Sequence, residues 1–248
     1  MAENIFKSGY VGLIGRTNVG KSTLINKIFN KNLVIVSAVA QTTRNRINCV
    51  YNTEDFQAIF VDCPGFFKPR NLLGEKLNKI VLSVLNDVDI ISVIVDLFGG
   101  IGIGDNYVIE KVKHIKKPKI LLANKIDLFS YSEKNKVNSK IDKLKEEFDF
   151  FDNIMAISAI TGENINNYLD FVSCKLPEGP KYFPDEIITD MPITKMISEI
   201  IREKISNNLF EEVPHGVYVE LENIEKTTTL SKEEITKIYC SIFVEKKS

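Results

Sequence analysis

Short apolar runs alternate with longer amphipathic segments through about residue 175. The apolar runs predict six strands, at residues 10–14, 47–51, 56–61, 90–95, 119–123 and 154–157. Helical spacing fills most intervals, with one apolar period from Leu77 to Val88 and another segment at residues 132–148. This alternation predicts a mostly parallel six-stranded sheet with helices on both faces. The second and third strands are the exception, because residues 52–55 are too few for a crossover and allow only an antiparallel hairpin.

The pattern changes near Leu176. Residues 176–186, LPEGPKYFPDE, hold three prolines, which predicts an extended linker. A helical period follows at residues 192–209, and two strand-like runs come after it, at residues 216–226 and 235–245. Ser231 and Glu234 match a capping box, so the second run could begin with a helical turn, although its alternation favours a strand. We predict one domain at residues 1–178, and a linker with a small α+β domain at residues 179–248.

Composition narrows the class of protein. Hydrophobic residues make up 44% and charged residues 26%, which are globular values. The net charge of −1 gives no overall attraction to nucleic acid or to an anionic membrane, and we expect no DNA partner. The four cysteines form no CxxC pair, so we expect neither zinc nor disulfides, and a reducing cytoplasm fits. The chain shows no signal-peptide pattern and no apolar stretch of about 18 residues that would span a membrane.

Residues 15–22 read GRTNVGKS, a full G-x-x-x-x-G-K-[ST] match between a predicted strand and an amphipathic helix. Glycines let backbone N–H groups close on phosphates, and the helix N-terminus adds a favourable dipole. Lys21 can then reach the β- and γ-phosphates, and Ser22 can ligate Mg²⁺. We predict a nucleotide-phosphate site here.

The chain holds two DxxG segments, Asp62–Gly65 and Asp96–Gly99. Asp62 ends the strand expected beside the phosphate-loop strand, so it can hold Mg²⁺ through water, and Gly65 can offer its N–H to the γ-phosphate. We expect Asp96 to end an ordinary strand, followed by a glycine-rich loop and a helix capped near Asp105.

Residues 124–127 read NKID after another apolar run. A carboxylate at Asp127 can accept both N1–H and N2–H₂ of guanine, which adenine cannot supply, so an ATP-using enzyme is disfavoured. The aliphatic stem of Lys125 can cover the base plane. After the sixth run, Ser158 and Ala159 are placed so that the Ala159 N–H would meet guanine O6.

Together these motifs resemble the TRAFAC class of GTPases, and within it the Era family. The segments that carry the resemblance are GRTNVGKST, AQTTRNRI, DCPGF, NKID and SAITG, followed after residue 182 by FPDEIITD, EIIREKI and VPHGVYVELE. The resemblance covers nearly the whole chain. It implies a Ras-like P-loop GTPase domain followed by a type II KH-like domain, with GTP or GDP and Mg²⁺ as ligands. It also implies binding to the small (30S) ribosomal subunit and its 16S rRNA, assistance in subunit assembly, and peripheral membrane association in relatives.

The resemblance assigns roles to residues. Switch I would be residues 40–46, with Thr43 rather than Thr42 as the threonine that ligates Mg²⁺ and senses the γ-phosphate. Catalytic roles fall to Lys21, Thr43 and Gly65, and the metal set is Ser22, Thr43 and Asp62. The predicted nucleotide-binding residues are Gly15, Arg16, Thr17, Asn18, Val19, Gly20, Lys21, Ser22, Thr23, Asp62, Cys63, Pro64, Gly65, Phe66, Asn124, Lys125, Ile126, Asp127, Ser158, Ala159 and Ile160.

Two positions bear on the rate of hydrolysis. Many relatives place a glutamine directly after DxxG to orient the water, whereas Phe66 and Phe67 stand here, so we expect slow intrinsic turnover. Asn18 occupies the position of the asparagine in potassium-activated members of the class. It either helps to bind K⁺ near the phosphates or only stabilises the turn.

The second region departs from the family pattern. The RNA-clamping GXXG loop of a KH domain does not occur after the linker, and the sequence ends at Ser248 after the second predicted strand. Residues 181–248 hold nine Lys and Arg against thirteen Asp and Glu, a net charge of −4, which is unlike an RNA-binding surface. We therefore expect an incomplete KH-like domain. The alternative to an RNA-binding switch is a guanine-nucleotide-binding regulatory module with negligible turnover and no RNA binding.

Overall fold

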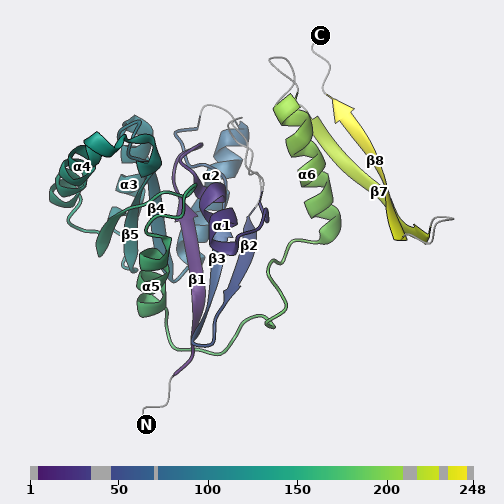
Figure 1. The fold of residues 1–248 in the computed structure, drawn as a ribbon, viewed down its shortest axis with the longest axis horizontal. Helices are drawn as coiled ribbons and strands as arrows, with labels where there is room; N and C mark the ends of the chain where they lie inside the picture. Colours follow the sequence, from purple (N-terminus) through teal and green to yellow (C-terminus); the bar gives the residue numbers. More distant parts are fainter. Residues whose placement is uncertain (1–4, 35–45, 70–71, 209–216, 229–233, 245–248) are drawn as a thin grey trace. The chain divides into compact units, whose positions relative to one another are not determined.

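The computed structural model describes residues 5–34, 46–69, 72–208, 217–228 and 234–244. The described residues form two units, one that ends at Asp190 and one that begins at Met191. In the first unit a six-stranded sheet has the order β2-β3-β1-β4-β5-β6 (Figure 1). Its strands are β1 Lys7–Ile14, β2 Ile47–Asn52, β3 Phe56–Asp62, β4 Ile90–Asp96, β5 Lys119–Asn124 and β6 Asn153–Ala156.

Strand directions follow the predicted pattern. β2 and β3 pair antiparallel, with Ile47 opposite Asp62 and Asn52 opposite Gln57, and the other neighbours pair parallel. The carboxyl ends of β1, β3, β4 and β5 therefore meet at one edge, which is where parallel α/β sheets place their ligands. All six predicted strands and the predicted hairpin are confirmed.

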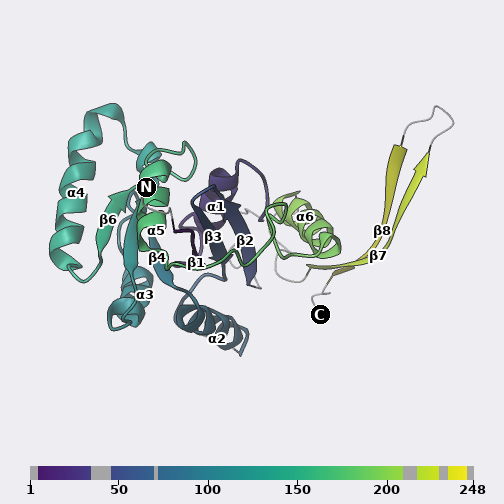
Figure 2. The same ribbon diagram turned by 90° about the horizontal axis from the view of Figure 1, so that it is seen from below.

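Helices cover both faces of the sheet. The helices of this unit are α1 Lys21–Phe29, α2 Leu72–Asp87, α3 Ile103–Lys113, α4 Lys134–Glu147 and α5 Ile165–Lys175, with 3₁₀ turns η1 Ile126–Leu128 and η2 Tyr131–Glu133. Figure 2 shows α1 and α5 on one face and α2 and α3 on the other. On the second face, apolar side chains of α2, α3 and α4 share one buried core with β1, β3, β4 and β5. Burial on both faces explains the nearly continuous apolar runs of the central strands.

The linker lies along the first unit. Residues 177–190, here called the strap, begin beside β1, where the Ser8 N–H donates to the Pro177 carbonyl at 3.0 Å. The strap ends beside the outer edge of β2, where the Val50 N–H donates to the Ile188 carbonyl at 2.9 Å. Linker residues 179–190, which we predicted as part of the second region, are thus hydrogen-bonded to the sheet of the first unit.

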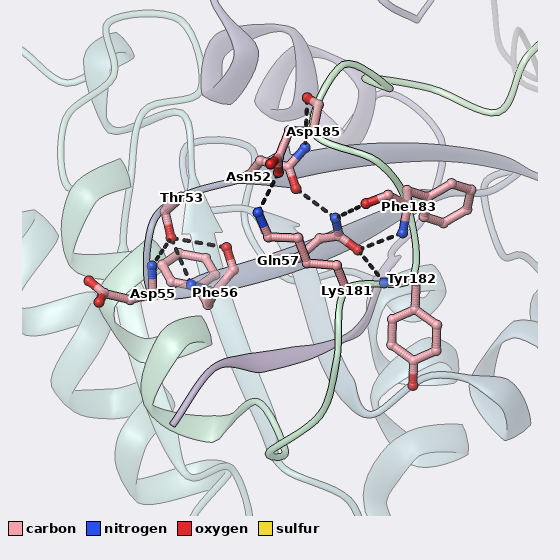
Figure 3. Close-up of polar contacts among 9 residues, drawn as sticks. All are labelled: Asn52, Thr53, Asp55, Phe56, Gln57, Lys181, Tyr182, Phe183 and Asp185. Atoms are coloured by element: carbon pink, nitrogen blue, oxygen red, sulfur yellow. Dashed lines mark hydrogen bonds and ion pairs between the residues drawn. The ribbon is translucent and has the colours of Figure 1, made fainter. Parts of the chain in front are cut away.

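A buried glutamine fixes the middle of the strap (Figure 3). Gln57 of β3 is fully buried, and its amide nitrogen donates to Asn52 Oδ1 at 2.7 Å and to the Phe183 carbonyl at 2.8 Å. Its amide oxygen accepts the N–H groups of Tyr182 at 2.7 Å and Phe183 at 3.0 Å. Both the nitrogen and the oxygen of the amide are therefore hydrogen-bonded, and three of the four bonds join them to backbone groups of the strap.

The second unit is a helix and a hairpin. Its elements are α6 Ile193–Asn208, β7 Val217–Thr228 and β8 Glu234–Val244. β7 and β8 pair antiparallel with an irregularity between Leu221 and Asn223, and α6 packs against β7, where Val217 and Val219 are buried. The predicted strand is confirmed where β8 begins at Glu234. This order of helix, strand and strand matches the predicted KH-like region. Among the described residues, the helices are all too short or too polar to cross a bilayer.

Replacing Gln57 tests the strap. In Gln57→Leu, backbone groups of Tyr182 and Phe183 lose their partners, so we expect the free energy of unfolding to fall by about 1–3 kcal/mol. Limited proteolysis should also cut residues 177–190 faster. Asn138→Leu, at an exposed amide on α4, is the control. Equal urea-unfolding free energies for Gln57→Leu and the control would contradict the proposed anchoring.

Candidate guanine-nucleotide site

The phosphate loop connects β1 to α1, so its residues 15–20 lie at the carboxyl edge of the sheet. Lys21 opens α1 and is buried, and its ammonium donates to the carbonyls of Gly15 at 3.1 Å and Arg16 at 2.8 Å. Burial lowers the pKa of Lys21, while the neighbouring Cys63 and Asp62 act in the opposite direction. A partly desolvated ammonium at a helix N-terminus suits an anionic ligand.

The first DxxG packs directly against this loop. Asp62 is fully buried at the end of β3, and the Ser22 hydroxyl donates to its Oδ2 at 2.9 Å. The Phe66 N–H donates to the Gly15 carbonyl at 3.0 Å. Gly65 lies so close to Thr17 that a Cβ on Gly65 would be 2.7 Å from the Thr17 backbone nitrogen. The two predicted phosphate motifs are therefore in contact, and only glycine fits at position 65 in this arrangement.

Phe66 lies in the core. Its ring is 1% exposed and packs on Tyr107 of α3, with ring centroids 5.3 Å apart. The residue after the first DxxG thus serves as an apolar support under this segment.

Asn124 joins the two ends of the site. Its amide nitrogen donates to the Val19 carbonyl of the phosphate loop at 2.7 Å, and its amide oxygen accepts the Ala159 N–H at 2.9 Å. Asn124 itself is 2% exposed at the end of β5. One side chain therefore holds the phosphate loop, the NKID segment and the Ser-Ala-Ile segment together.

The side chains at the predicted base end also contact one another. The Ser158 hydroxyl donates to Asp127 Oδ1 at 2.6 Å, which orients the carboxylate. Lys125 has left-handed backbone with φ 71°, and its ammonium lies 2.8 Å from Asp96 Oδ2. Ile126 is tied to the next loop through its N–H, which donates to the Ile157 carbonyl at 3.3 Å. Ile160 is exposed.

Thr43 and the rest of the predicted switch I up to residue 45 lie outside the described residues. Arg46, the last residue of that segment, is described. Its guanidinium pairs with Asp87 at the end of α2 at 2.9 Å.

The sequence did not reveal two acidic partners of the site. Asp105, in the first turn of α3, is buried and pairs with Arg16 of the phosphate loop at 3.0 Å. Asp105 also accepts the Gly102 N–H, so that α3 is capped at Gly102.

Asp96 ends β4, as predicted, and also contacts Lys125. Burial acts to raise the pKa of Asp96, but the Gly99 N–H and the Lys125 ammonium outweigh it, so this pKa lies below its ordinary value. The sequence feature that could have indicated this contact is the position of Asp96 at the end of β4, the strand beside β5.

Comparison with known proteins agrees with this geometry. The model of the 50S ribosome-binding GTPase family matches residues 10–125. GTPase Era of Alkaliphilus oremlandii is 42% identical over 243 residues, which cover 98% of this chain and 80% of the relative. GTPase Era of Caldanaerobacter subterraneus subsp. tengcongensis is 44% identical over 243 residues, with 98% and 79% covered.

Two solved structures are similar over the same extent. Crystalline Era in complex with MgGDPNP and a segment of 16S ribosomal RNA has a TM-score of 0.89 and 32% identity, and a variant of Aquifex aeolicus Era bound to GDP·AlF₄⁻ has a TM-score of 0.90 and 32% identity. In both comparisons 98% of this chain and 80% of the other are covered.

The fold and the sequence motifs define a P-loop GTPase with a Ras-like catalytic domain. Within that class, the identity of more than 40% across 98% of the chain assigns it to one family. The chain belongs to the Era family of GTPases.

Gly20 and Gly100 form a matched pair for testing the phosphate loop. Both have left-handed backbone, with φ 102° and 80°, but a Cβ on Gly20 would lie 2.3 Å from Asn124 Nδ2, whereas a Cβ on Gly100 would meet nothing within 4 Å. We expect Gly100→Ala to cost about 1–2 kcal/mol of unfolding free energy from backbone strain alone. Gly20→Ala should cost more, because Asn124 must also move. Equal losses in nucleotide-free protein would argue against this tight contact.

Proposed function

We propose that this GTPase binds one guanine nucleotide across the carboxyl edge of its sheet, with the phosphates at Lys21 and the base at Asp127. The observation that carries the proposal is the Asn124 amide, which bonds to both the phosphate loop and the Ala159 loop. This contact between the two motif groups supports a single site made of both. Residues 15–23 surround the phosphates, and residues 124–127 and 158–160 surround the base.

Ser22 and Asp62 fit a magnesium ion. Both offer oxygen atoms, which Mg²⁺ prefers, and these atoms lie 2.9 Å apart beside the phosphate loop. Thr43 completes the proposed metal set on the family resemblance. When bound, the ion would neutralise charge on the β- and γ-phosphates. K⁺ near Asn18 is a further part of the proposal and rests on the family resemblance alone, because the left-handed backbone at that residue (φ 63°) is also what a turn-stabilising asparagine adopts. Equal GTPase rates in K⁺ and Na⁺ buffers would contradict it.

In the proposed hydrolysis, Lys21 stabilises the transferring phosphoryl group, Gly65 donates its N–H to the γ-phosphate, and Thr43 senses that phosphate. Such a reaction depends on positioning and on electrostatic stabilisation. The buried ring of Phe66 cannot orient a water molecule, and neither can the apolar ring of Phe67. Intrinsic turnover should therefore be slow until a partner supplies or orders the missing group.

The small ribosomal subunit and its 16S rRNA are the proposed partners, and subunit assembly is the proposed process. Support comes from the Era relatives and from the Era structure that contains a 16S rRNA segment. A cytoplasmic location fits four free cysteine thiols. Peripheral association with the inner face of the membrane rests on the family resemblance alone.

Base recognition is tested by Asp127→Asn. The amide can no longer accept two N–H groups from guanine, so we expect GTP affinity to fall by about 10³-fold or more. The new N–H₂ suits the oxygen that xanthine carries at C2, so affinity for xanthosine triphosphate should rise. Competition between the two nucleotides measures both effects. Asp142→Asn, at an exposed carboxylate of α4, should keep the original preference. Retained GTP preference in Asp127→Asn would refute the base site.

The ribosomal partner is tested by single-turnover GTP hydrolysis with and without small ribosomal subunits. We expect slow hydrolysis alone and stimulation on the order of 10-fold or more by subunits, because the partner must complete the catalytic site. Lys21→Ala controls for GTPases that contaminate the subunits. Identical rates in both conditions would exclude stimulation by the small subunit.

A further inference from the structure

The second DxxG, Asp96–Gly99, is a motif that the proposed phosphate site does not use. Asp96 lies at the other end of the site, because it ends β4 in register with Asn124 of β5. Its Oδ2 is 2.8 Å from the ammonium of Lys125, the residue whose stem is proposed to cover the base. The carboxylate of Asp96 therefore contacts Lys125, a residue of the proposed base pocket.

Asp96 is held rigidly. Its Oδ1 accepts the Gly99 N–H at 2.8 Å, and the Leu97 N–H that follows it donates to the Asn124 carbonyl at 2.9 Å. The side chain of Asp96 is only 14% exposed. The carboxylate is thus fixed by its own loop and by the neighbouring strand before any ligand arrives.

A fixed carboxylate also fixes the lysine. Lys125 is held at its Cα by a left-handed backbone with φ 71° and at its ammonium by Asp96, so the four-carbon stem between these points has little freedom. A free lysine stem would lose rotamer entropy when a base packed against it. Here that entropy is lost on folding, which preorganises the apolar wall for the base.

We propose that Asp96 is a positioning residue for guanine-nucleotide binding, which holds Lys125 so that its aliphatic stem forms one preformed wall of the base pocket. The inference rests on the proposed function and deepens it. Because the effect is exerted at the base, Asp96 should support GDP and GTP binding equally. The Ser22–Asp62 pair occupies the phosphate end, so hydrolysis of bound GTP should not depend on Asp96.

The first test measures GDP and GTP affinity, GDP dissociation rate and single-turnover hydrolysis in Asp96→Asn. This variant keeps an oxygen for the Gly99 N–H but removes the charge that holds Lys125. We expect both affinities to fall by the same factor, about 3- to 10-fold, as expected when one side chain is no longer preorganised. Hydrolysis at saturating GTP should stay within about twofold of wild type. Asp96→Ser, which keeps a smaller oxygen acceptor, is the second variant if Asp96→Asn is unstable.

Glu133→Gln is the matched control. Like Asp96, Glu133 accepts one backbone N–H, from Ser130, and one lysine ammonium, from Lys136, and it also accepts the Ser130 hydroxyl. It lies in η2, outside the proposed base pocket. Its replacement should leave both nucleotide affinities unchanged.

A double-mutant cycle separates positioning from general stabilisation. Lys125→Met keeps an apolar stem but has no ammonium for Asp96 to hold, so adding Asp96→Asn to Lys125→Met should change GDP affinity by less than about twofold. A purely structural role of Asp96 would weaken binding equally in both backgrounds. Additive effects, or a loss confined to GTP or to hydrolysis, would overturn the inference. If wild type binds GDP and Asp127→Asn switches base preference, while Asp96→Asn binds like wild type, this inference fails and the proposed function stands.

Discussion

The site depends on one buried amide. Asn124 bonds through its nitrogen to Val19 and through its oxygen to Ala159, so a single residue sets the separation between the loops proposed to hold phosphate and base. Parallel strands bring these loops to one edge, but strand pairing alone leaves their spacing free. An amide suits this task because it both donates and accepts, which neither a carboxylate nor an ammonium can do when ionised.

Close backbone packing adds a second constraint. The first DxxG contacts the phosphate loop through the Phe66 N–H and the Gly15 carbonyl, and Gly65 lies against Thr17 without room for a side chain. The two segments therefore cannot shift independently. A ligand that moves one segment must therefore also move the other. A nucleotide-dependent switch requires this kind of coupling.

Much of the first unit could be predicted from sequence. Strands and helices repeat apolar residues with different periods, so β1 to β6 and the β2–β3 hairpin could be located, and fixed motif spacing located the loops around Lys21, Asp62 and Asp127. The contacts of Asp96 with Lys125 and of Asp105 with Arg16 could not be predicted. Each joins residues far apart in the chain through side chains, which leaves no local pattern. Proline spacing predicted an extended linker, but its docking depends on the buried amide of Gln57.

The strap affects whether two molecules of this protein can associate through their sheet edges. β2 is the outer strand of the sheet, and an open strand edge can template pairing with another molecule. Here the Val50 N–H and the Asn48 carbonyl are already bonded to Ile188 and Asp190 of the same chain. A second molecule could extend the sheet at this position only after those residues had been displaced. The segment that leads out of the catalytic domain thus also protects it against self-association through strand addition.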